Sequence, residues 1–517
     1  MFEQLVADAI RNGGVADWAR VENAACARRL SAMADMLDKR IAADGADDRD
    51  QWCIDNWDAV SAEIAAAQNV SKGVASHQLS VANALRDRLP RVDELFAAGL
   101  ISYRMVETVE SRTRLVGNRD VIARVDAEIA AEISAWRTLS QEKLKSSIDY
   151  FVDRHDPMAV RRTEGKSRAR RVDFIDPNDG TGLVTIEVTV YTHEAKGMRD
   201  RLDAMTATVC PGDLRTREQQ RVDAFVAAFN GHELSCACGD VKCLASQVAP
   251  SNVVVNVIAN EESLTDDTPA RLDGPQEPGP TREEMASMTI AELLRDPTPG
   301  LVASTRPSVV LGGGMLPAPV LAAKVAKSAK IRYIKHPGDA APEPRYRPSK
   351  ALEWFVRCRD MTCRAPGCDV PADRCDIDHV IPYPFGSTQA SNLICLCRIH
   401  HLLKTFLGWT LDLSPDGTVI WTLPDGSTQT TYPGSRLLFP TLCKPTAPVV
   451  VRGTPVETPG RTLKMPRRTR TRAQNRAQSI EAERRRNAAY LATAHAPRVA
   501  KAAHLLGVAG DEEPPPF

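Results

Sequence analysis

Residues 363–404 read CRAPGCDVPADRCDIDHVIPYPFGSTQASNLICLCRIHHLLK, and this stretch decides how the rest of the chain is interpreted. It holds two short clips of soft metal ligands. Four residues separate Cys363 from Cys368, and two residues separate Cys397 from His400. A tight turn lets each clip present two ligands on one side, so two clips can close a tetrahedron around Zn²⁺. The spacing therefore predicts a structural zinc site made by these four side chains.

A second set of ligands is interleaved with the first. Asp378 and His379 are adjacent, Asn392 follows, and His401 comes directly after His400. A carboxylate, imidazoles and an amide are what hydrolysis with one hard metal ion needs. Neighbouring residues of an α-helix lie about 100° apart around its axis, so His400 and His401 can face two different metal sites.

Together these residues resemble the HNH endonucleases, a family with a ββα-metal fold. The match runs through Asp378–Pro382, Gly386, Asn392–Leu393, Leu396–Cys397, His400–His401 and Lys404. The zinc-clipped members of this family usually have cysteine where this chain has His400, so the resemblance implies that His400 replaces the last cysteine as a zinc ligand. They commonly have a second glycine where this chain has Ser387. That departure concerns the conformation of the loop and not the chemistry.

The resemblance implies an enzyme that hydrolyses the phosphodiester bonds of DNA, by cutting or nicking, and it leaves RNA open as a substrate. His379 is the expected general base. Asp378 and His401 are expected to hold a catalytic Mg²⁺ or Mn²⁺ ion. Asn392 is expected to hold the loop that carries the base, because an amide bridges backbone groups as both donor and acceptor.

Basic residues around the motif are candidates for contact with nucleic acid. Lys404 follows His401 by three residues and is placed to touch a phosphate. Arg345, Arg347 and Lys350 precede the motif and are expected to contact the backbone as well, since cationic side chains supply most of the affinity for a polyanion.

Composition bounds the class of protein. A chain of 517 residues is too long for one core, and its formal net charge of zero means that a nucleic-acid partner is argued only from where basic residues lie. The start lacks the pattern of a secretory signal, and no apolar run approaches the roughly 18 to 20 residues of a membrane helix. The 13 cysteines include clusters with the spacing of metal ligands, which favours a reducing compartment over one in which disulfides form. We therefore expect a cytoplasmic protein.

Residues 1–261 are expected to form a mainly α-helical N-terminal domain with a small strand pair. Up to about residue 155, apolar residues recur three and four positions apart, as in amphipathic helices. Residues 182–191 and 252–259 predict two strands that pair with each other. This region resembles the helical domain of unknown function that precedes the HNH domain in many actinobacterial proteins, and the resemblance implies no established activity.

A separate cysteine cluster lies between those two strands. Cys236, Cys238 and Cys243 offer three thiolates, and Cys210 or His232 would be needed as a fourth ligand. No second clip follows at the usual distance. The pattern leaves two alternatives open, a small zinc site or reduced cysteines in a loop.

The middle of the chain leads into the metal motif. Residues 262–344 are rich in Pro, Gly, Asp and Ser, which predicts a connector. Residues 345–440 are expected to form the HNH nuclease domain. Within it, Ser349 can cap a helix, and residues 408–413 and 418–423 flank a Ser-Pro-Asp-Gly turn as a β-hairpin.

Residues 441–517 turn Pro-rich and then basic. They are expected to be a largely disordered tail with a partial helix at 473–494. The arginines between Arg461 and Arg486 suit non-specific attraction to a polyanion.

The sequence thus predicts an α+β chain with a helical N-terminal domain, a zinc-stapled ββα-metal module and a basic tail. The leading hypothesis is a metal-dependent HNH endonuclease. The alternative is a non-catalytic DNA-binding or assembly protein that keeps the zinc-stapled fold. The joint presence of Asp378, His379, Asn392 and His401 favours the enzyme, because a protein that only binds has no chemical need for all four. Oligomeric state is not indicated.

Overall fold

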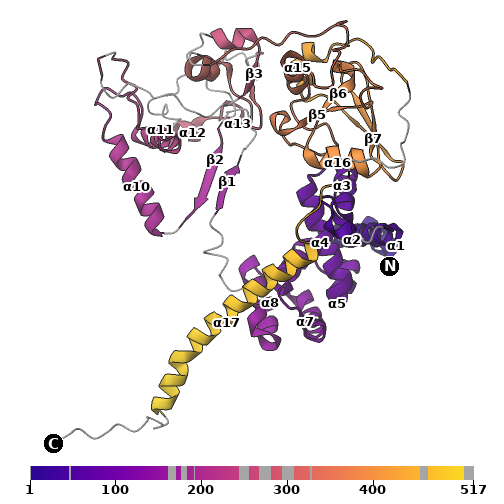
Figure 1. The fold of residues 1–517 in the computed structure, drawn as a ribbon. Coiled ribbons are helices and arrows are strands. Elements are labelled where there is room, and N and C mark those ends of the chain that lie inside the picture. Colours follow the sequence, from indigo (N-terminus) through magenta and orange to yellow (C-terminus); the bar gives the residue numbers. More distant parts are fainter. Residues whose placement is uncertain are drawn as a thin grey trace, which may run out of the picture.

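In the computed structural model, the chain forms a helical N-terminal bundle, a small module rich in Cys and His, and a long C-terminal helix (Figure 1). The described residues are 2–45, 48–160, 171–175, 183–190, 192–240, 242–243, 256–266, 281–293, 308–326, 329–453 and 464–505. The predicted α+β class, with a mainly helical N-terminal region followed by small antiparallel sheets, is confirmed.

The bundle begins with consecutive helices joined by short turns. Helices α1 to α8 span Phe2–Asn12, Val15–Ala43, Asn56–Gln68, Lys72–Arg88, Pro90–Ala97, Tyr103–Thr113, Arg119–Glu132 and Gln141–His155. Side-chain oxygens of Ser71, Ser102 and Asn118 accept hydrogen bonds from first-turn N–H groups of α4, α6 and α7. These bonds satisfy donors that every helix start leaves unpaired, so the polar breaks in the sequence define the helix starts.

One apolar core holds these helices together. Leu30, Leu79, Phe96, Val109 and Ile148 come from five different helices and are fully buried in a single cluster. Burial of each such side chain contributes roughly 1.5 to 3 kcal/mol relative to exposure. The apolar periodicity of the sequence is therefore the core-facing stripe of each helix.

The Cys/His module, residues 345–440, is built from one leading helix, a ββα unit and a meander. Its elements are α15 (Lys350–Asp360), β5 (Asp376–His379), β6 (Leu393–Leu396), α16 (Arg398–Phe406), β7 (Thr410–Leu413), β8 (Val419–Thr422) and β9 (Thr428–Thr431). Strands β5 and β6 pair antiparallel, with Asp378 opposite Ile394 and His379 opposite Leu393. The predicted cap at Ser349 and the predicted hairpin are confirmed, and β9 extends the hairpin to three strands.

A buried charge network joins α15 to β6. Arg359, Asp360 and Arg364 are almost completely buried. Arg359 donates to the carbonyl of Leu393 at 2.7 Å, and Asp360 accepts from the N–H of Cys395 at 2.8 Å. Arg364 donates to Asp360 and to the carbonyl of Thr431 in β9 of the three-stranded sheet. Burial opposes ionisation of Asp360, but the two arginines outweigh it and lower its pKa, so the carboxylate stays charged and paired.

The small strand pairs differ from the predicted pairing. Strand β1 (Arg171–Ile175) pairs with β2 (Thr185–Thr189), and β3 (Val257–Ala259) pairs with β4 (Ser308–Val310), both antiparallel. The prediction that strand 182–191 pairs with strand 252–259 is wrong, and residues 252–255 lie outside the described residues. The partner of β2 is the strand nearest to it in sequence, because closing a short loop costs less entropy than closing a long one.

The predicted connector, residues 262–344, contains folded pieces. These are α12 (Arg282–Ser287), α13 (Ile290–Leu293), β4 and α14 (Ala318–Val320). Ile258 of β3 and Val309 of β4 share a small core with Cys358, Met361 and Phe439 of the module. The strand pair is therefore anchored to the module.

Bundle and module share a core although they are far apart in sequence. Ile54 and Ala59 of the bundle are buried in the same cluster as Phe355 and Trp421 of the module, and Figure 1 shows α3 directly beneath α16. Gly367 has a φ of +67°, and a Cβ on it would lie 2.6 Å from a carbonyl oxygen of the bundle. Only glycine permits this approach without strain.

The tail carries more regular structure in its described part than the sequence predicts. Helix α17 (Arg472–Leu505, yellow in Figure 1) includes the predicted partial helix at 473–494. Ahead of it, the carbonyl of Pro466 accepts from the N–H of Cys53 at 2.7 Å, and Met465 is buried in the core that bundle and module share. This segment, residues 464–471, therefore joins the module to the bundle, and we call it the strap.

Two tail arginines bind carboxylates of the bundle. Arg468 donates to Asp55 at 2.8 Å and also pairs with Asp58, which accepts from Arg472 at 2.9 Å. Charge neutralised within the chain contributes less to attraction for an external polyanion. Arg461, the first arginine of the predicted basic run, lies outside the described residues.

These contacts make the stability of the strap dependent on pH. Burial opposes ionisation of Asp58, but Lys72, Arg472 and Arg468 outweigh it, so its pKa is lowered from 3.8. A lowered pKa contributes stability that is present above the unfolded-state value and is lost as pH falls through the folded-state value. Asp58→Asn should therefore cost on the order of 1 kcal/mol at neutral pH and nothing in acid.

Thermal melting of the wild type and of Asp58→Asn, from neutral to acid pH, measures this difference in stability. Asp35→Asn is the matched control, because Asp35 pairs with Arg86 at 2.5 Å but keeps 52% of its side chain exposed. A melting difference for Asp58→Asn that stays constant from neutral to acid pH would contradict the ion-pair account.

Candidate active site and metal centre

Four soft ligands converge where the two clips meet. The ligand atoms of Cys363, Cys368, Cys397 and His400 all lie within 4.8 Å of one another. Cys397 Sγ lies 3.2 Å from His400 Nδ1, and Cys368 Sγ lies 3.9 Å from Cys397 Sγ. Four ligands at about 2.0 to 2.3 Å from one zinc ion require separations of this size. The group is consistent with structural zinc.

The environment of this group also fits a cation. Cys363, Cys397 and His400 are buried, and burial raises the pKa of the Cys363 thiol well above 9.0. Buried thiolates need a neighbouring positive charge, and a metal ion bound by thiols displaces their protons. All four positions of a tetrahedral ion would be taken, which is the closed arrangement of structural zinc and leaves no place for a reacting water.

Helix α16 carries ligands of both kinds. Cys397 is the N-cap of the helix, and its N–H donates to Cys363 Sγ at 3.3 Å. His400 turns inward and is 5% exposed, whereas the side chain of His401 is 27% exposed. The predicted divergence of the two adjacent histidines follows from the helical turn between them.

His401 faces two carboxylates of strand β5. Its Nδ1 lies 2.9 Å from Asp376 Oδ2, and its Nε2 lies 3.5 Å from Asp378 Oδ1. Asp376 accepts a hydrogen bond from Nδ1–H, and in a neutral ring Nε2 then has a lone pair that faces a carboxylate oxygen. A cation between these two acceptors would relieve their repulsion. A histidine held by a carboxylate on its other nitrogen is a frequent metal ligand.

Lys404 points into the site. Its Nζ donates to Asp378 Oδ2 at 2.7 Å and to the carbonyl of His379 at 2.5 Å. Its side chain is only 15% exposed. The predicted phosphate-contacting residue therefore lies beside the predicted metal ligand, where its charge offsets that of the carboxylate.

His379 is buried at the end of β5, next to Asp378. Its Nε2 lies 2.9 Å from the hydroxyl of Thr388, which itself donates to the carbonyl of Tyr346. With the hydroxyl proton directed to that carbonyl at 3.4 Å, Thr388 accepts from Nε2–H, and the tautomer consistent with this arrangement has its lone pair on Nδ1. Among the described residues, Nδ1 has no hydrogen-bond partner in the protein. Burial lowers the pKa of His379, with Asp378 opposing and Lys404 adding to the shift, so the ring is neutral at neutral pH.

Asn392 holds the loop after His379. Its Oδ1 accepts from the N–H of Ile381 at 2.8 Å, and its Nδ2 donates to the carbonyls of Ile381 and Ser387 at 3.0 and 2.9 Å. A Cβ on Gly386 would lie 2.5 Å from Asn392 Nδ2, so only glycine fits under this amide. Ser387, where a second glycine was expected, is buried and bonds Gln389. The loop therefore accommodates serine at the position where a second glycine was expected.

The other predicted nucleic-acid contacts, Arg345, Arg347 and Lys350, lie on the surface. Arg345 and Arg347 are exposed, and the intervening Tyr346 stacks on the His379 ring, with centroids 5.2 Å apart and planes 17° apart. Lys350 is 81% exposed and bonds Glu353. Among the described residues, neither arginine has an ion-pair partner.

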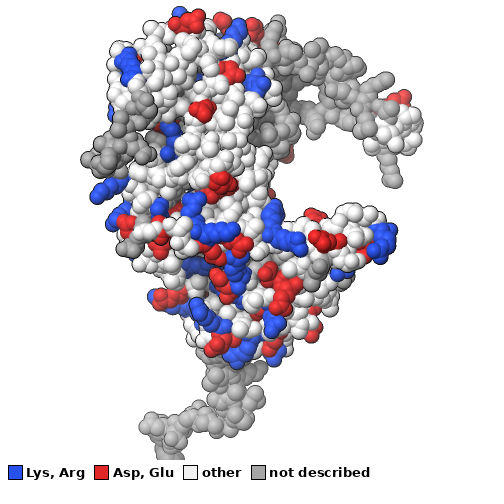
Figure 2. Space-filling view, turned by 90° about the vertical axis from the view of Figure 1, so that its right-hand side faces the viewer, with Lys and Arg blue, Asp and Glu red and all other residues white. Residues whose placement is uncertain are grey.

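Charges on one face of the chain are mixed. The face drawn in Figure 2 shows Lys and Arg interspersed with Asp and Glu over its lower half and few charges over its upper half. The basic residues next to the site therefore matter more than the total charge, which is zero.

Three residues of the site were missed from the sequence. Asp376 lies two positions before Asp378, so both point to the same face of β5, and this alternation was the available signal. Thr388 and Tyr346 reach His379 through the loop and the segment ahead of α15. Neither has a local pattern that marks it.

Comparison with known proteins identifies the larger part of the chain. The model of a family described as "Domain of unknown function (DUF222)" matches residues 17–299. The chain belongs to the DUF222 family.

Similar proteins come from Mycobacterium tuberculosis. "Uncharacterized protein Rv2100" of strain ATCC 25618 / H37Rv is 44% identical over 492 residues, covering 93% of this chain and 88% of that protein. "Uncharacterized protein Rv3776" of the same strain is 42% identical over 487 residues, covering 92% and 90%. Alignments this long necessarily include residues 363–404, so the similarity is not limited to the DUF222 region. No solved structure matches the chain.

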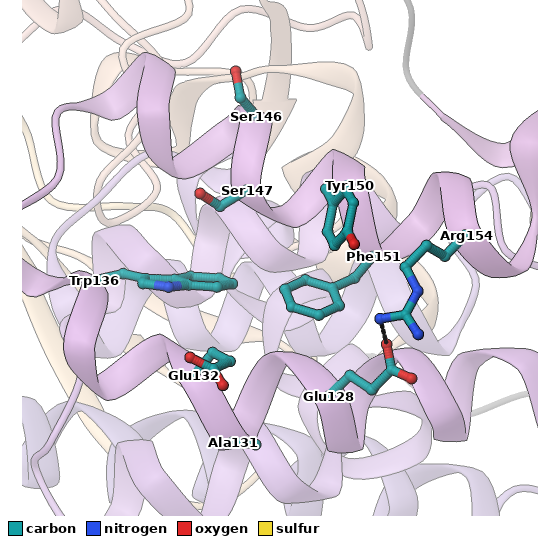
Figure 3. Close-up of a pocket in the computed structure, with 9 residues that line it drawn as sticks. All are labelled: Glu128, Ala131, Glu132, Trp136, Ser146, Ser147, Tyr150, Phe151 and Arg154. Carbon is teal, nitrogen blue, oxygen red and sulfur yellow. Dashed lines mark hydrogen bonds and ion pairs between the residues drawn. The ribbon is translucent and has the colours of Figure 1, made fainter.

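The DUF222 bundle has a shallow hollow between α7 and α8 (Figure 3). It measures about 670 Å³, and its wall is an aromatic pair, Trp136 and Phe151, with the ion pair Glu128–Arg154 at 3.3 Å. Neither helix contributes to the Cys/His site, and we assign no catalytic role to this hollow. In the described part of this DUF222 chain, no helix is both long and apolar enough to cross a membrane.

If the Cys/His group binds zinc, loss of one ligand should remove the ion and melt the module. Cys368→Ser should release about one zinc ion per chain and unfold the segment around β5, β6 and α16. Metal analysis and hydrogen exchange on the purified chain measure both effects.

Cys443→Ser is the control, because Cys443 lies close to the module but bonds Ser435 and is outside the group. It should keep its zinc and its melting temperature. Unchanged zinc content and unchanged melting in Cys368→Ser would rule out the zinc assignment.

Proposed function

We propose that the Cys/His module is a metal-dependent HNH-type endonuclease that hydrolyses phosphodiester bonds of DNA. The observation that carries the proposal is the position of His379. Its Nε2 is bound to Thr388, which leaves Nδ1 available, and the next residue in the strand, Asp378, faces His401 Nε2 at 3.5 Å. The order of these residues around β5, β6 and α16 supports the same reading, because it is the order of the HNH motif.

The site residues fit one divalent ion held by Asp378 and His401. Two ligand atoms about 2.1 Å from one ion lie roughly 3 Å or slightly more apart, close to the observed separation of their oxygen and nitrogen atoms. Asp376 would orient His401 and keep its proton on Nδ1. When bound, such an ion supplies charge stabilisation at the scissile phosphate and the leaving oxygen.

His379 would act as the general base. Nδ1 would take a proton from a water molecule as its oxygen attacks phosphorus. The bond from phosphorus to the 3′ oxygen breaks, and the 3′ oxygen leaves with the bonding pair and takes a proton from solvent. Thr388 holds Nε2–H, which fixes the tautomer that leaves Nδ1 basic. The lowered pKa keeps the ring unprotonated at neutral pH, and the Asp378 charge stabilises the imidazolium as it forms.

Substrate binding would involve the surface next to His379. Arg345 and Arg347 flank the tyrosine that stacks on the base and are free to meet phosphates. Lys404 would neutralise charge within the site. The tail arginines are a weaker candidate than the sequence indicated, since Arg468 and Arg472 bind the bundle.

Three single variants test the assignment of roles. His379→Ala should lower cleavage by about 100-fold to 10,000-fold while keeping fold, zinc and DNA affinity, because a base acts in the transition state. His401→Ala should lower affinity for Mn²⁺ and lose cleavage, with partial rescue by more Mn²⁺. His400→Ala should instead lose zinc and melt earlier. Plasmid nicking, metal analysis and melting measure these effects on the full chain.

The variant Asp376→Asn distinguishes two roles of His401, a metal ligand oriented by Asp376 and a simple ion-pair partner of the two carboxylates. If Asp376 orients His401 for an ion, the variant should need about 10-fold to 100-fold more Mn²⁺ for the same rate, with little change at saturation. Arg398→Ala is the control, because Arg398 also approaches Asp376, at 3.9 Å, but is 64% exposed. If the wild type binds DNA but cuts neither DNA nor RNA with any divalent ion, the alternative of a binding protein is correct.

A further inference from the structure

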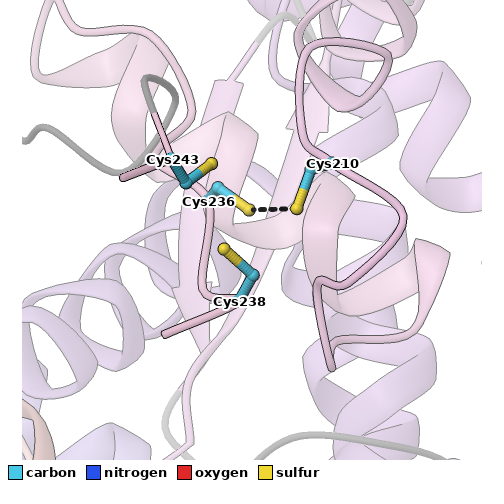
Figure 4. A group of neighbouring side chains, drawn as sticks. All are labelled: Cys210, Cys236, Cys238 and Cys243. Atoms are coloured by element: carbon cyan, nitrogen blue, oxygen red, sulfur yellow. Dashed lines mark hydrogen bonds between the residues drawn. The ribbon is translucent and has the colours of Figure 1, made fainter. Parts of the chain in front are cut away.

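A second group of four cysteines lies in the DUF222 region, away from the proposed catalytic site. Two loops supply it, one after α10 (Thr192–Thr206) and one after α11 (Arg217–Phe229). The sulfur atoms of Cys210, Cys236, Cys238 and Cys243 all lie within 4.8 Å of one another. Figure 4 shows the four side chains pointing toward a common centre.

The spacing of the sulfur atoms fits a tetrahedral ion. Zn–S bonds of about 2.3 Å place the four sulfurs roughly 3.8 Å apart. Cys210 Sγ and Cys236 Sγ lie 3.5 Å apart, which is far longer than the roughly 2.05 Å of a disulfide bond. None of the 13 cysteines, all of which are described, forms a disulfide.

Tight backbone turns lie next to the cysteines in both loops. The carbonyl of Cys210 accepts from the N–H of Asp213 at 3.1 Å, and the carbonyl of Asp240 accepts from the N–H of Cys243 at 3.0 Å. Gly239, between Cys238 and Asp240, has a φ of +74°, which glycine adopts without strain. The chain can therefore turn sharply between Cys238 and Cys243.

A buried ion pair holds the two loops together next to the cysteines. Asp213 and Arg215 form it at 2.6 Å, with both side chains no more than 5% exposed. Asp213 Oδ2 accepts from the N–H of Ala237 at 2.9 Å, and Arg215 donates to the carbonyl of Ser235 at 2.7 Å. The loop that carries three cysteines is thus held against the loop that carries Cys210.

The apolar core of this region is small. Among the described residues, its buried cluster consists of Met205, Ala224 and Leu234. A core of this size supplies too little burial to hold two helices and their loops, and natural domains of this kind add a metal or disulfides.

We propose that Cys210, Cys236, Cys238 and Cys243 bind a structural zinc ion that holds α10 to α11. Four protein ligands leave no open coordination position, so the ion has no place for a substrate or a reacting water. The fourth ligand is Cys210 and not His232, the other candidate from the sequence, because His232 is outside the group. Binding displaces the thiol protons, which pass to solvent.

The test is metal analysis of the full chain purified under reducing, zinc-replete conditions. The wild type should contain about two zinc ions per chain, one for each group of ligands. Cys238→Ser should lose about one of them, and hydrogen exchange should rise at α10, α11 and their loops while the Cys/His module stays protected. Cys26→Ser is the control, because Cys26 lies on α2 and should leave the zinc content unchanged.

Two results would overturn the proposal. One is a zinc content in Cys238→Ser equal to that of the wild type. The other is a wild-type chain with one zinc ion that Cys368→Ser removes, together with a disulfide between Cys210 and Cys236 detected by thiol counting. Nuclease activity is not part of the readout, so failure of the proposed function leaves this test unaffected.

Discussion

The arrangement of the Cys/His module depends on one helix that serves two sites. At the start of α16, His400 turns inward to the buried cysteines and His401 turns outward to the carboxylates of β5. Under the proposed function the two positions need opposite environments, because a structural zinc site is closed to water and a catalytic site would have to admit a substrate. The rotation of about 100° between neighbouring helical residues provides both. Anything that shifts the start of α16 moves both sites together.

The rest of the fold limits such shifts. The buried network of Arg359, Asp360 and Arg364 holds α15 to β6, and β6 holds β5 in register. The module in turn shares its core with α3 of the bundle, and the strap ahead of α17 covers the junction. The DUF222 bundle is therefore a platform for the module, and three regions that are separate in sequence form one packed body.

Patterns that are local in sequence were predictable, and contacts between distant segments were not. The two clips around Cys363 and Cys397, the cap at Ser349 and the β7–β8 hairpin depend on residues close to one another. The pairing of β3 with β4 and the binding of Arg468 to Asp58 join segments whose individual patterns carry no mark of the partner. The alternation of side chains along a strand could have predicted that Asp376 lies on the same face of β5 as Asp378. Its contact with His401 could not be predicted, because that contact depends on where α16 packs.

The central claim is that the two adjacent histidines serve two different metal ions. The most direct measurement is anomalous diffraction from crystals of the full chain soaked in Mn²⁺, recorded at both the manganese and the zinc absorption edges. The account predicts a manganese peak within bonding distance of Asp378 and His401 Nε2, and a separate zinc peak among Cys363, Cys368, Cys397 and His400. A zinc peak without any manganese at Asp378, or both metals at the cysteine group alone, would contradict it.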